Sequence, residues 1–345
     1  MQDDFDRIVN DVTDRCNDIY DYHQYEKQVT KEGTIAKHYN RIGTNSFSFV
    51  DDVVDSIPSG FYRPIYDNFN NKYFIERKNV EKPRIYHLPV KIFDEILNDI
   101  HTFWNSKEVY KNFGEVYKLN FLLYSVPGNG KTCLINIIAE ELMATHNGIV
   151  ITINSLSELV AYPKVIESIR RIEPDRKVLT VIEDFDGLVG TDKSAETLLL
   201  QILDGNDSVS DVITIATTNY IEQLKPSFTA RPSRFRVYEY KRPITNVRRF
   251  YIYNKLKDFG LDVDKEEHKI LIDRLTEKSD GYTFDLLKEL VTMIFVLGYT
   301  EDDAVQKMNE VKESNGKLNN TEDSPKKIGF VGGDKSYTEI HKLNF

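Results

Sequence analysis

An apolar run that ends in a glycine-rich turn constrains this chain more than any other feature. Leu122 and Leu123 lead into a turn made of Ser125, Val126, Pro127, Gly128, Asn129, Gly130, Lys131 and Thr132. The pattern predicts a strand, a tight loop and a helix, in which backbone N–H groups and the lysine ammonium bind the phosphates of a nucleotide. The threonine hydroxyl then lies where Mg²⁺ binds.

Position 125 departs from the usual motif Gly-x-x-x-x-Gly-Lys-Thr, because a serine stands in place of the first glycine. Gly128 and Gly130, the glycines nearest the phosphates, are both present. We therefore expect nucleotide binding with an altered entry to the loop. For the motif taken alone, an ordinary strand, turn and helix without a ligand is the alternative.

Bulk composition sets the broad class. A chain of 345 residues with 40% hydrophobic and 29% charged residues is typical of a soluble globular protein of about two domains. No apolar run approaches the roughly 20 residues of a membrane span, and the acidic residues 1–6 do not resemble an export signal. The two cysteines, Cys16 and Cys133, provide no framework for disulfides or zinc, which favours a reducing, cytoplasmic setting.

The charge balance is acidic. The net charge is −10, and residues 1–60 carry 12 acidic against 6 basic side chains. Binding to a phosphate backbone needs a positive surface, so the overall charge disfavours nucleic acid as a partner without excluding a local basic channel.

The pattern along the chain divides it into four parts. Residues 61–66 and 72–75 predict a hairpin, residues 89–104 an amphipathic helix, and residues 148–217 alternating strands and helices, which indicate a parallel sheet. Helical stretches follow over 247–258, 265–277 and 284–297, and residues 314–327 have the composition of a mobile tail. A short helix is expected within 5–19. The expected parts are a small N-terminal domain (1–85), an α/β domain (86–240), a helical lid (241–300) and a polar tail (301–345).

An acidic pair follows the strand predicted over 178–182. Glu183 and Asp184 stand at its carboxyl end, where one carboxylate can hold Mg²⁺ and the other can polarise the attacking water. An acidic turn after a strand is common, but this one follows the lysine loop by some 50 residues with strands and helices between them.

Two further motifs lie downstream. A strand over 212–217 runs into Asn219, whose amide can orient the attacking water, although an asparagine in a turn is the ordinary alternative. Arg231 and Arg234 follow a short helix and can reach the γ-phosphate of a neighbouring subunit. Taken alone, these arginines are surface charges.

The order of these motifs closely resembles the AAA subgroup of the AAA+ ATPases. Residues 103–110, 183–186 and 217–220 are most similar to the branch that contains the mitochondrial Rieske-protein translocase. The resemblance covers about residues 86–300 and implies a P-loop NTPase fold with a parallel sheet flanked by helices. It also implies ATP and Mg²⁺ as cofactors and a homo-oligomeric ring of six or seven subunits.

The resemblance assigns roles by position. Lys131 corresponds to the phosphate lysine, Thr132 and Glu183 to the Mg²⁺ ligands, Asp184 to the catalytic carboxylate and Asn219 to the first sensor. The two residues that correspond to the arginines acting between subunits are Arg231 and Arg234.

This chain differs from the family in three respects. Its acidic pair is Glu then Asp instead of Asp then Glu, which shortens the catalytic arm by one methylene; we expect hydrolysis to persist, and the sequence does not fix its rate. The membrane helix of the mitochondrial members is absent, so their substrate and location do not carry over. Tyr162 is the only candidate for a pore-loop aromatic, and a packing role for it is equally compatible with the sequence.

Three functions agree with these residues. The first is a ring-forming ATPase that remodels or translocates an unknown protein client, with residues 1–85 recognising the client or an adaptor. The second is a nucleic-acid motor or loader on the same fold. The third is a slow or non-hydrolysing nucleotide switch, which Ser125 and the reversed acids suggest.

Overall fold

The computed structural model describes residues 56–79, 86–191, 193–204 and 210–318, together with the backbone of two short strands, β1 (Tyr39–Arg41) and β2 (Phe47–Phe49). These two strands pair in antiparallel fashion. Cys16, the helix expected within 5–19 and residues 319–345 lie outside the described residues.

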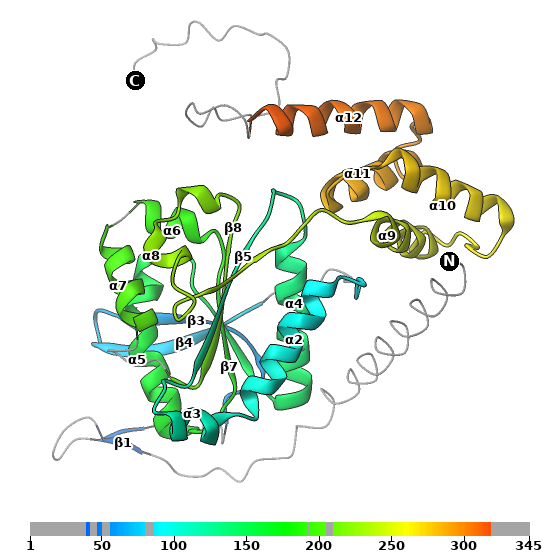
Figure 1. Cartoon of the computed structure of the whole chain (residues 1–345). Helices are drawn as coiled ribbons and strands as arrows, with labels where there is room; N and C mark the ends of the chain where they lie inside the picture. Colours follow the sequence, from blue (N-terminus) through cyan, green and yellow to red (C-terminus); the bar gives the residue numbers. More distant parts are fainter. Residues whose placement is uncertain are drawn as a thin grey trace, which may run out of the picture.

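A seven-stranded sheet forms the centre of the larger unit, in the order β4, β3, β6, β7, β8, β5, β9 (Figure 1). Every neighbouring pair is parallel except β3 and β4. The strands are β3 (Gly60–Asp67), β4 (Lys72–Lys78), β5 (Lys118–Tyr124), β6 (Ile149–Thr152), β7 (Val178–Ile182), β8 (Val212–Thr218) and β9 (Arg236–Glu239). The predicted mostly parallel sheet is confirmed.

The hairpin expected near residue 60 is present as β3 and β4. Its residues pair from Phe61 with Lys78 to Asp67 with Lys72. The first residues of β3 also pair in parallel with β6, so the hairpin forms one edge of the central sheet. From the sequence, this hairpin is expected within an N-terminal domain of residues 1–85, whereas its hydrogen bonds join it to the α/β unit.

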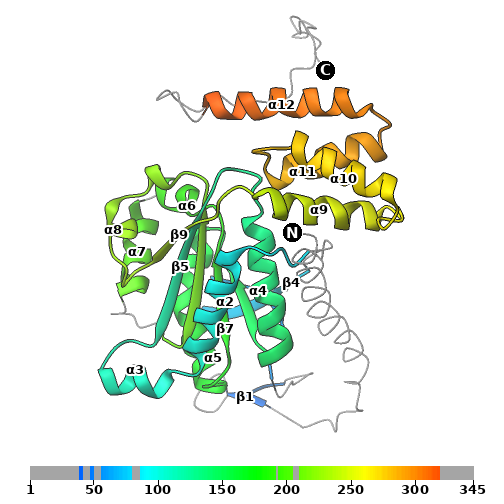
Figure 2. The ribbon, with the colours of Figure 1, turned by 45° about the vertical axis from the view of Figure 1, so that its right-hand side comes forward.

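Helices cover both faces of the sheet, because alternate residues of the strands point to opposite faces. On one side lie α2 (Lys91–Trp104) and α4 (Lys131–His146), and on the other lie α5 (Leu156–Ile172), α6 (Phe185–Thr191), α7 (Lys193–Asp204) and α8 (Pro226–Thr229), as Figure 1 shows; Figure 2 gives the same helices turned by 45°. On β5, Phe121 and Leu123 belong to the first apolar cluster and Leu122 belongs to the second. The remaining short elements of this unit are α3 (Lys107–Phe113) and the 3₁₀ turn η2 (Ile221–Gln223).

Tyr162 lies inside α5 and not in a loop. Its ring is 2% exposed, and its hydroxyl shares a hydrogen bond of 2.6 Å with the Thr180 hydroxyl on β7. Burial raises the pKa of this phenol far above its ordinary value. Tyr162 therefore packs helix against sheet, and the suggestion that it is a pore-loop residue is wrong for this structure.

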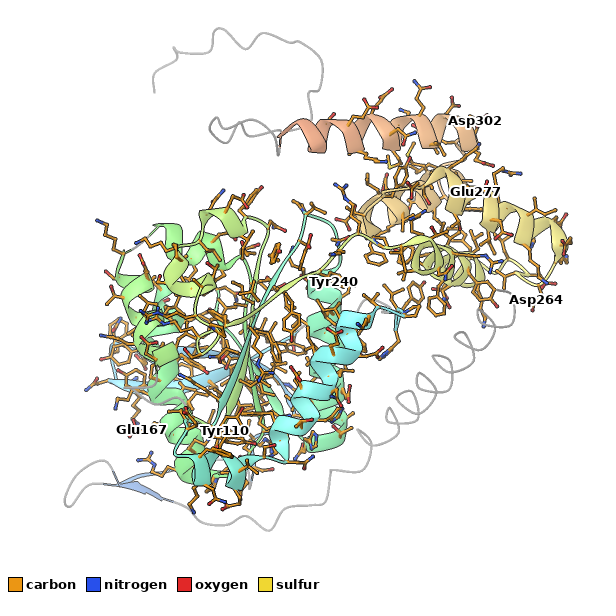
Figure 3. The ribbon with its side chains drawn as sticks, in the orientation of Figure 1. Tyr110, Glu167, Tyr240, Asp264, Glu277 and Asp302 are labelled. Atoms are coloured by element: carbon orange, nitrogen blue, oxygen red, sulfur yellow. The ribbon has the colours of Figure 1, made fainter. Side chains whose placement is uncertain are left out.

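A helical unit follows the sheet. It contains α9 (Thr245–Asp258), α10 (Glu266–Lys278), α11 (Phe284–Phe295) and α12 (Glu301–Leu318), and Tyr240 lies where the two units meet (Figure 3). The first apolar cluster continues from α2 and α4 into α9, α10 and α11. The two units thus share buried apolar contacts.

Residues 301–318, which the sequence analysis assigns to a polar tail, form helix α12 instead. Ala304 and Met308, one helical turn apart, are buried, and the Tyr282 hydroxyl donates to the carbonyl of Val305 and to Asn309. A narrow apolar stripe of two residues is enough to dock a helix that is otherwise polar. Within the described residues, no helix combines the length and the apolar composition needed to span a membrane.

Candidate nucleotide site

The glycine-rich loop connects β5 to α4 at the carboxyl edge of the sheet. Gly128 has φ +73° and Gly130 has φ +87°, values that residues with a side chain rarely adopt. A Cβ at Gly128 would also lie 2.6 Å from the Asp285 carboxylate, and one at Gly130 would lie 3.2 Å from the Phe284 ring. Both glycines are therefore required by backbone conformation and by close approach of α11.

Lys131 begins helix α4 and points back across the base of the loop. Its ammonium donates to Asn219 Oδ1 at 2.6 Å, to Ser125 Oγ at 2.9 Å and to the Ser125 carbonyl at 3.3 Å. The structure thus brings together the predicted phosphate lysine and the predicted sensor asparagine, which are 88 residues apart in sequence.

Thr132 and Glu183 also meet. The threonine hydroxyl donates to Glu183 Oε1 at 2.5 Å, from the first turn of α4 to the end of β7. A hydroxyl and a carboxylate that converge on one point are oxygen ligands of the kind Mg²⁺ prefers. The described residues hold no cluster of three or more His, Cys, Asp or Glu that could bind a metal ion. An Mg²⁺ ion here would therefore also need phosphate oxygens and water.

Asp184 is the exposed member of the acidic pair and precedes α6 with φ +48°. Aspartate tolerates this left-handed conformation better than most residues. Two residues on, Asp186 accepts a hydrogen bond of 2.5 Å from the Thr218 hydroxyl, which itself accepts from the backbone N–H of Tyr220. The first bond links the segments that follow β7 and end β8. Together the two bonds hold Thr218 and Tyr220, the neighbours of Asn219 in the sequence.

Burial and nearby charges have opposite effects on the pKa of Lys131. Burial lowers the pKa of the Lys131 ammonium, while the nearby carboxylates of Asp184, Asp186 and Glu183 act in the opposite direction. The lysine charge therefore faces three carboxylates, which repel an anionic ligand. A divalent cation between these carboxylates and the ligand would offset that repulsion.

One cavity of about 740 Å³ contains most of the predicted site. Its walls include five residues predicted from the sequence to bind or hydrolyse a nucleotide: Lys131, Thr132, Glu183, Asp184 and Asn219. The loop residues from Pro127 to Gly130 line it too, whereas Ser125 and Val126 are not among its lining residues. The buried Asn129 amide donates instead to the carbonyl of Tyr240 at 2.6 Å.

Sequence reasoning missed the lining residues that come from distant segments. Asp285 of α11 lines the cavity, and its backbone N–H donates to the carbonyl of Gly128 at 3.0 Å. Asn154, Ser155 and Leu188 also line it. Nothing local marks Asp285, an ordinary acidic residue in the first turn of a helix, because only the packing of α11 against the loop brings it here.

The two arginines have different surroundings. Arg231 is exposed on the turn after α8. Arg234 is buried and makes a two-pronged contact with Asp204, from Nε to Oδ1 at 2.7 Å and from Nη2 to Oδ2 at 2.5 Å, and it also donates to the Ser227 carbonyl. Hydrogen bonding to this arginine holds the pKa of Asp204 below its usual range. Neither arginine lines the cavity of its own chain.

Comparison with known proteins defines the class. Residues 121–242 match the family described as ATPase family associated with various cellular activities (AAA). This stretch is therefore an AAA ATPase domain. It runs from β5 past β9 and includes the glycine-rich loop, the acidic pair, Asn219 and both arginines. We call the glycine-rich loop, Ser125 to Thr132, the phosphate cradle.

Three relatives show what this chain is similar to. The protein AAA-ATPase At3g28600 of Arabidopsis thaliana is 30% identical over 185 residues, which cover 47% of this chain and 39% of that protein. The probable mitochondrial chaperone BCS1-A of Dictyostelium discoideum is 33% identical over 145 residues, or 38% of this chain and 33% of the relative. The proteasome-activating nucleotidase of Sulfurisphaera tokodaii is 25% identical over 280 residues, or 72% and 68%. The first two matches thus span about a third to two-fifths of the relatives.

Proposed function

We propose that this chain binds ATP with Mg²⁺ and hydrolyses it. The proposal depends above all on one observation, that Lys131, Thr132, Glu183, Asp184 and Asn219 line a single cavity although they come from three separate segments. Phosphate-binding, metal-binding and water-activating groups are the set that phosphoryl transfer to water requires.

Each residue has a defined task in this proposal. The N–H groups of the loop and the Lys131 ammonium bind the β- and γ-phosphates. Thr132 and Glu183 hold Mg²⁺, which neutralises charge on the phosphates when it is bound. Asp184 accepts a proton from the attacking water, and the Asn219 amide orients that water.

The positions of the two acids agree with a metal-binding role for Glu183 and a proton-accepting role for Asp184. Glu183 is the carboxylate that accepts the hydrogen bond from Thr132, whereas Asp184 is exposed and lines the cavity. The aspartate arm is one methylene shorter than the glutamate usual in the family, so we expect slow turnover. Very slow turnover would make the chain a nucleotide switch.

We further propose that the active form is a homo-oligomeric ring of six or seven subunits that remodels or translocates a protein client. The names of two relatives support action on a protein client, since one is a probable mitochondrial chaperone and the other a proteasome-activating nucleotidase. The ring is proposed from the resemblance to the AAA family. Residues 1–85 would recognise the client, in a cytoplasmic setting. Of the two arginines, the exposed Arg231 is the one that would act on a neighbouring subunit, and Arg234 would hold its segment in place.

Direct measurement of ATP binding tests the core of the proposal. In the presence of Mg²⁺, calorimetry should show binding to the wild-type chain and a loss of at least about a hundredfold in affinity for Lys131→Ala, which removes an ammonium that lines the cavity. Lys111→Ala, at an exposed position on α3, is the matched control and should bind as wild type does.

Two results would contradict the proposal. One is the absence of ATP binding to the folded wild-type chain, and the other is equal binding by wild type and Lys131→Ala. Turnover that rises severalfold on addition of DNA or RNA would favour the nucleic-acid motor as the function of the same cavity.

A further inference from the structure

Ser125 distinguishes this cradle from one that begins with glycine. The residue is 5% exposed at the exit of β5 and does not line the cavity. Its hydroxyl accepts a hydrogen bond from the Lys131 ammonium at 2.9 Å and donates to the carbonyl of Val126 at 2.9 Å. The hydroxyl thus both donates and accepts a hydrogen bond within the loop and the first residue of α4.

The lysine has no donor to spare. An ammonium group has three N–H donors, and three oxygens lie within hydrogen-bond distance of Lys131: the Ser125 carbonyl, the Ser125 hydroxyl and Asn219 Oδ1. A glycine at position 125 would supply the carbonyl alone. One of the three donors is therefore occupied by a group that the usual motif does not contain.

We propose that the Ser125 hydroxyl is a positioning group that holds the Lys131 ammonium, so that a phosphate oxygen must replace this hydroxyl before the lysine can bind ATP. This inference rests on the proposed function, since it concerns the affinity of the same site for ATP. The expected consequence is weaker binding than the same chain would show without the hydroxyl. Removal of one hydrogen bond to a charged group predicts roughly tenfold tighter binding.

The test compares Ser125→Ala with Ser125→Thr, which keeps a hydroxyl. Ser125 has no positive φ, so alanine is compatible with the backbone, and Ser125→Gly serves as a second variant without the hydroxyl. The affinity for ATP with Mg²⁺ is measured by calorimetry, and urea unfolding identifies any variant that does not fold. We expect about tenfold tighter binding for alanine and glycine, and affinity within about threefold of wild type for threonine.

Two outcomes would overturn the inference. In one, the folded alanine and glycine variants bind no more tightly than wild type. In the other, the threonine variant binds as tightly as they do, which would exclude the hydroxyl as the cause. A failure of the proposed function looks different, because wild type and all three variants would then show no binding of ATP.

Discussion

Glu183 and Thr132 share a hydrogen bond of 2.5 Å, although they lie on different elements. The order Glu then Asp could have placed either carboxylate toward the metal. The geometry favours the first, because Asp184 has left-handed φ at the start of α6 while the glutamate arm reaches the threonine. The longer side chain thus serves the metal and the shorter one serves the water.

This assignment makes a prediction for Glu183→Gln. An amide binds Mg²⁺ more weakly than a carboxylate, so the Mg²⁺ concentration for half-maximal turnover should rise by about tenfold. The measurement is an Mg²⁺ titration of ATP hydrolysis, with Glu115→Gln, at an exposed position before β5, as the control. An unchanged Mg²⁺ requirement in Glu183→Gln would assign the metal to another group.

Helix α5 shows where a local pattern leaves two roles open. Tyr162 stands beside Pro163, and the sequence is equally compatible with a pore-loop aromatic and with a packing role. The structure instead contains an uninterrupted helix from Leu156 to Ile172 with the proline inside it. The partner of the tyrosine is Thr180 on β7, a contact between elements that no local pattern reveals.

Tyr162→Phe should therefore affect stability and leave ATP turnover unchanged. Loss of the buried hydrogen bond to Thr180 should cost about 1 kcal/mol of unfolding free energy, measured by urea unfolding. The double variant Tyr162→Phe with Thr180→Val should cost less than the two single variants added together, because both partners are removed. Strict additivity would argue against a hydrogen bond between the two hydroxyls.

The predictable parts of the fold are those with long, regular patterns. The apolar runs of β5, β7 and β8 are buried on both faces, and the amphipathic stretches of α2 and α11 have wide apolar stripes, so both kinds of element can be predicted from sequence. Short elements such as α3, α6 and β9 leave too few residues for a periodic signal. Helix α12 has an apolar stripe of only two buried residues, which composition conceals.

The residues of the candidate site also fall into those that the sequence can predict and those that it cannot. Residues within a motif, such as Gly128 to Thr132, can be predicted because the motif itself fixes their geometry. Asp285 enters the cavity only through the packing of α11, and the pairing of Arg234 with Asp204 depends on how α7 meets β9. The sequence shows two equivalent arginines three residues apart, whereas burial and an acidic partner make them different.

At the scale of the assembly, Arg231 should matter only between subunits. Arg231→Ala should lower ATP turnover by about a thousandfold while leaving ATP binding intact, because its cradle is unchanged. Arg242→Ala, at an exposed position after β9, is the control. Mixing Arg231→Ala with Lys131→Ala chains should restore part of the activity, since one supplies the cradle and the other the arginine.

Two results would contradict an arginine acting between subunits. Full turnover by Arg231→Ala would exclude a role for this residue. A mixture that assembles but stays as inactive as its components would exclude action across a subunit boundary.

Steady-state ATP hydrolysis by the purified wild-type chain with Mg²⁺, compared with that of Asp184→Asn, measures directly whether this cavity catalyses hydrolysis. We expect slow but measurable turnover by wild type. We expect a loss of at least about a hundredfold in Asp184→Asn, with ATP affinity preserved because the lysine and the loop are intact. Asp264→Asn, exposed in the helical unit (Figure 3), should hydrolyse ATP as wild type does. Equal turnover by wild type and Asp184→Asn would contradict the assignment of catalysis to this cavity.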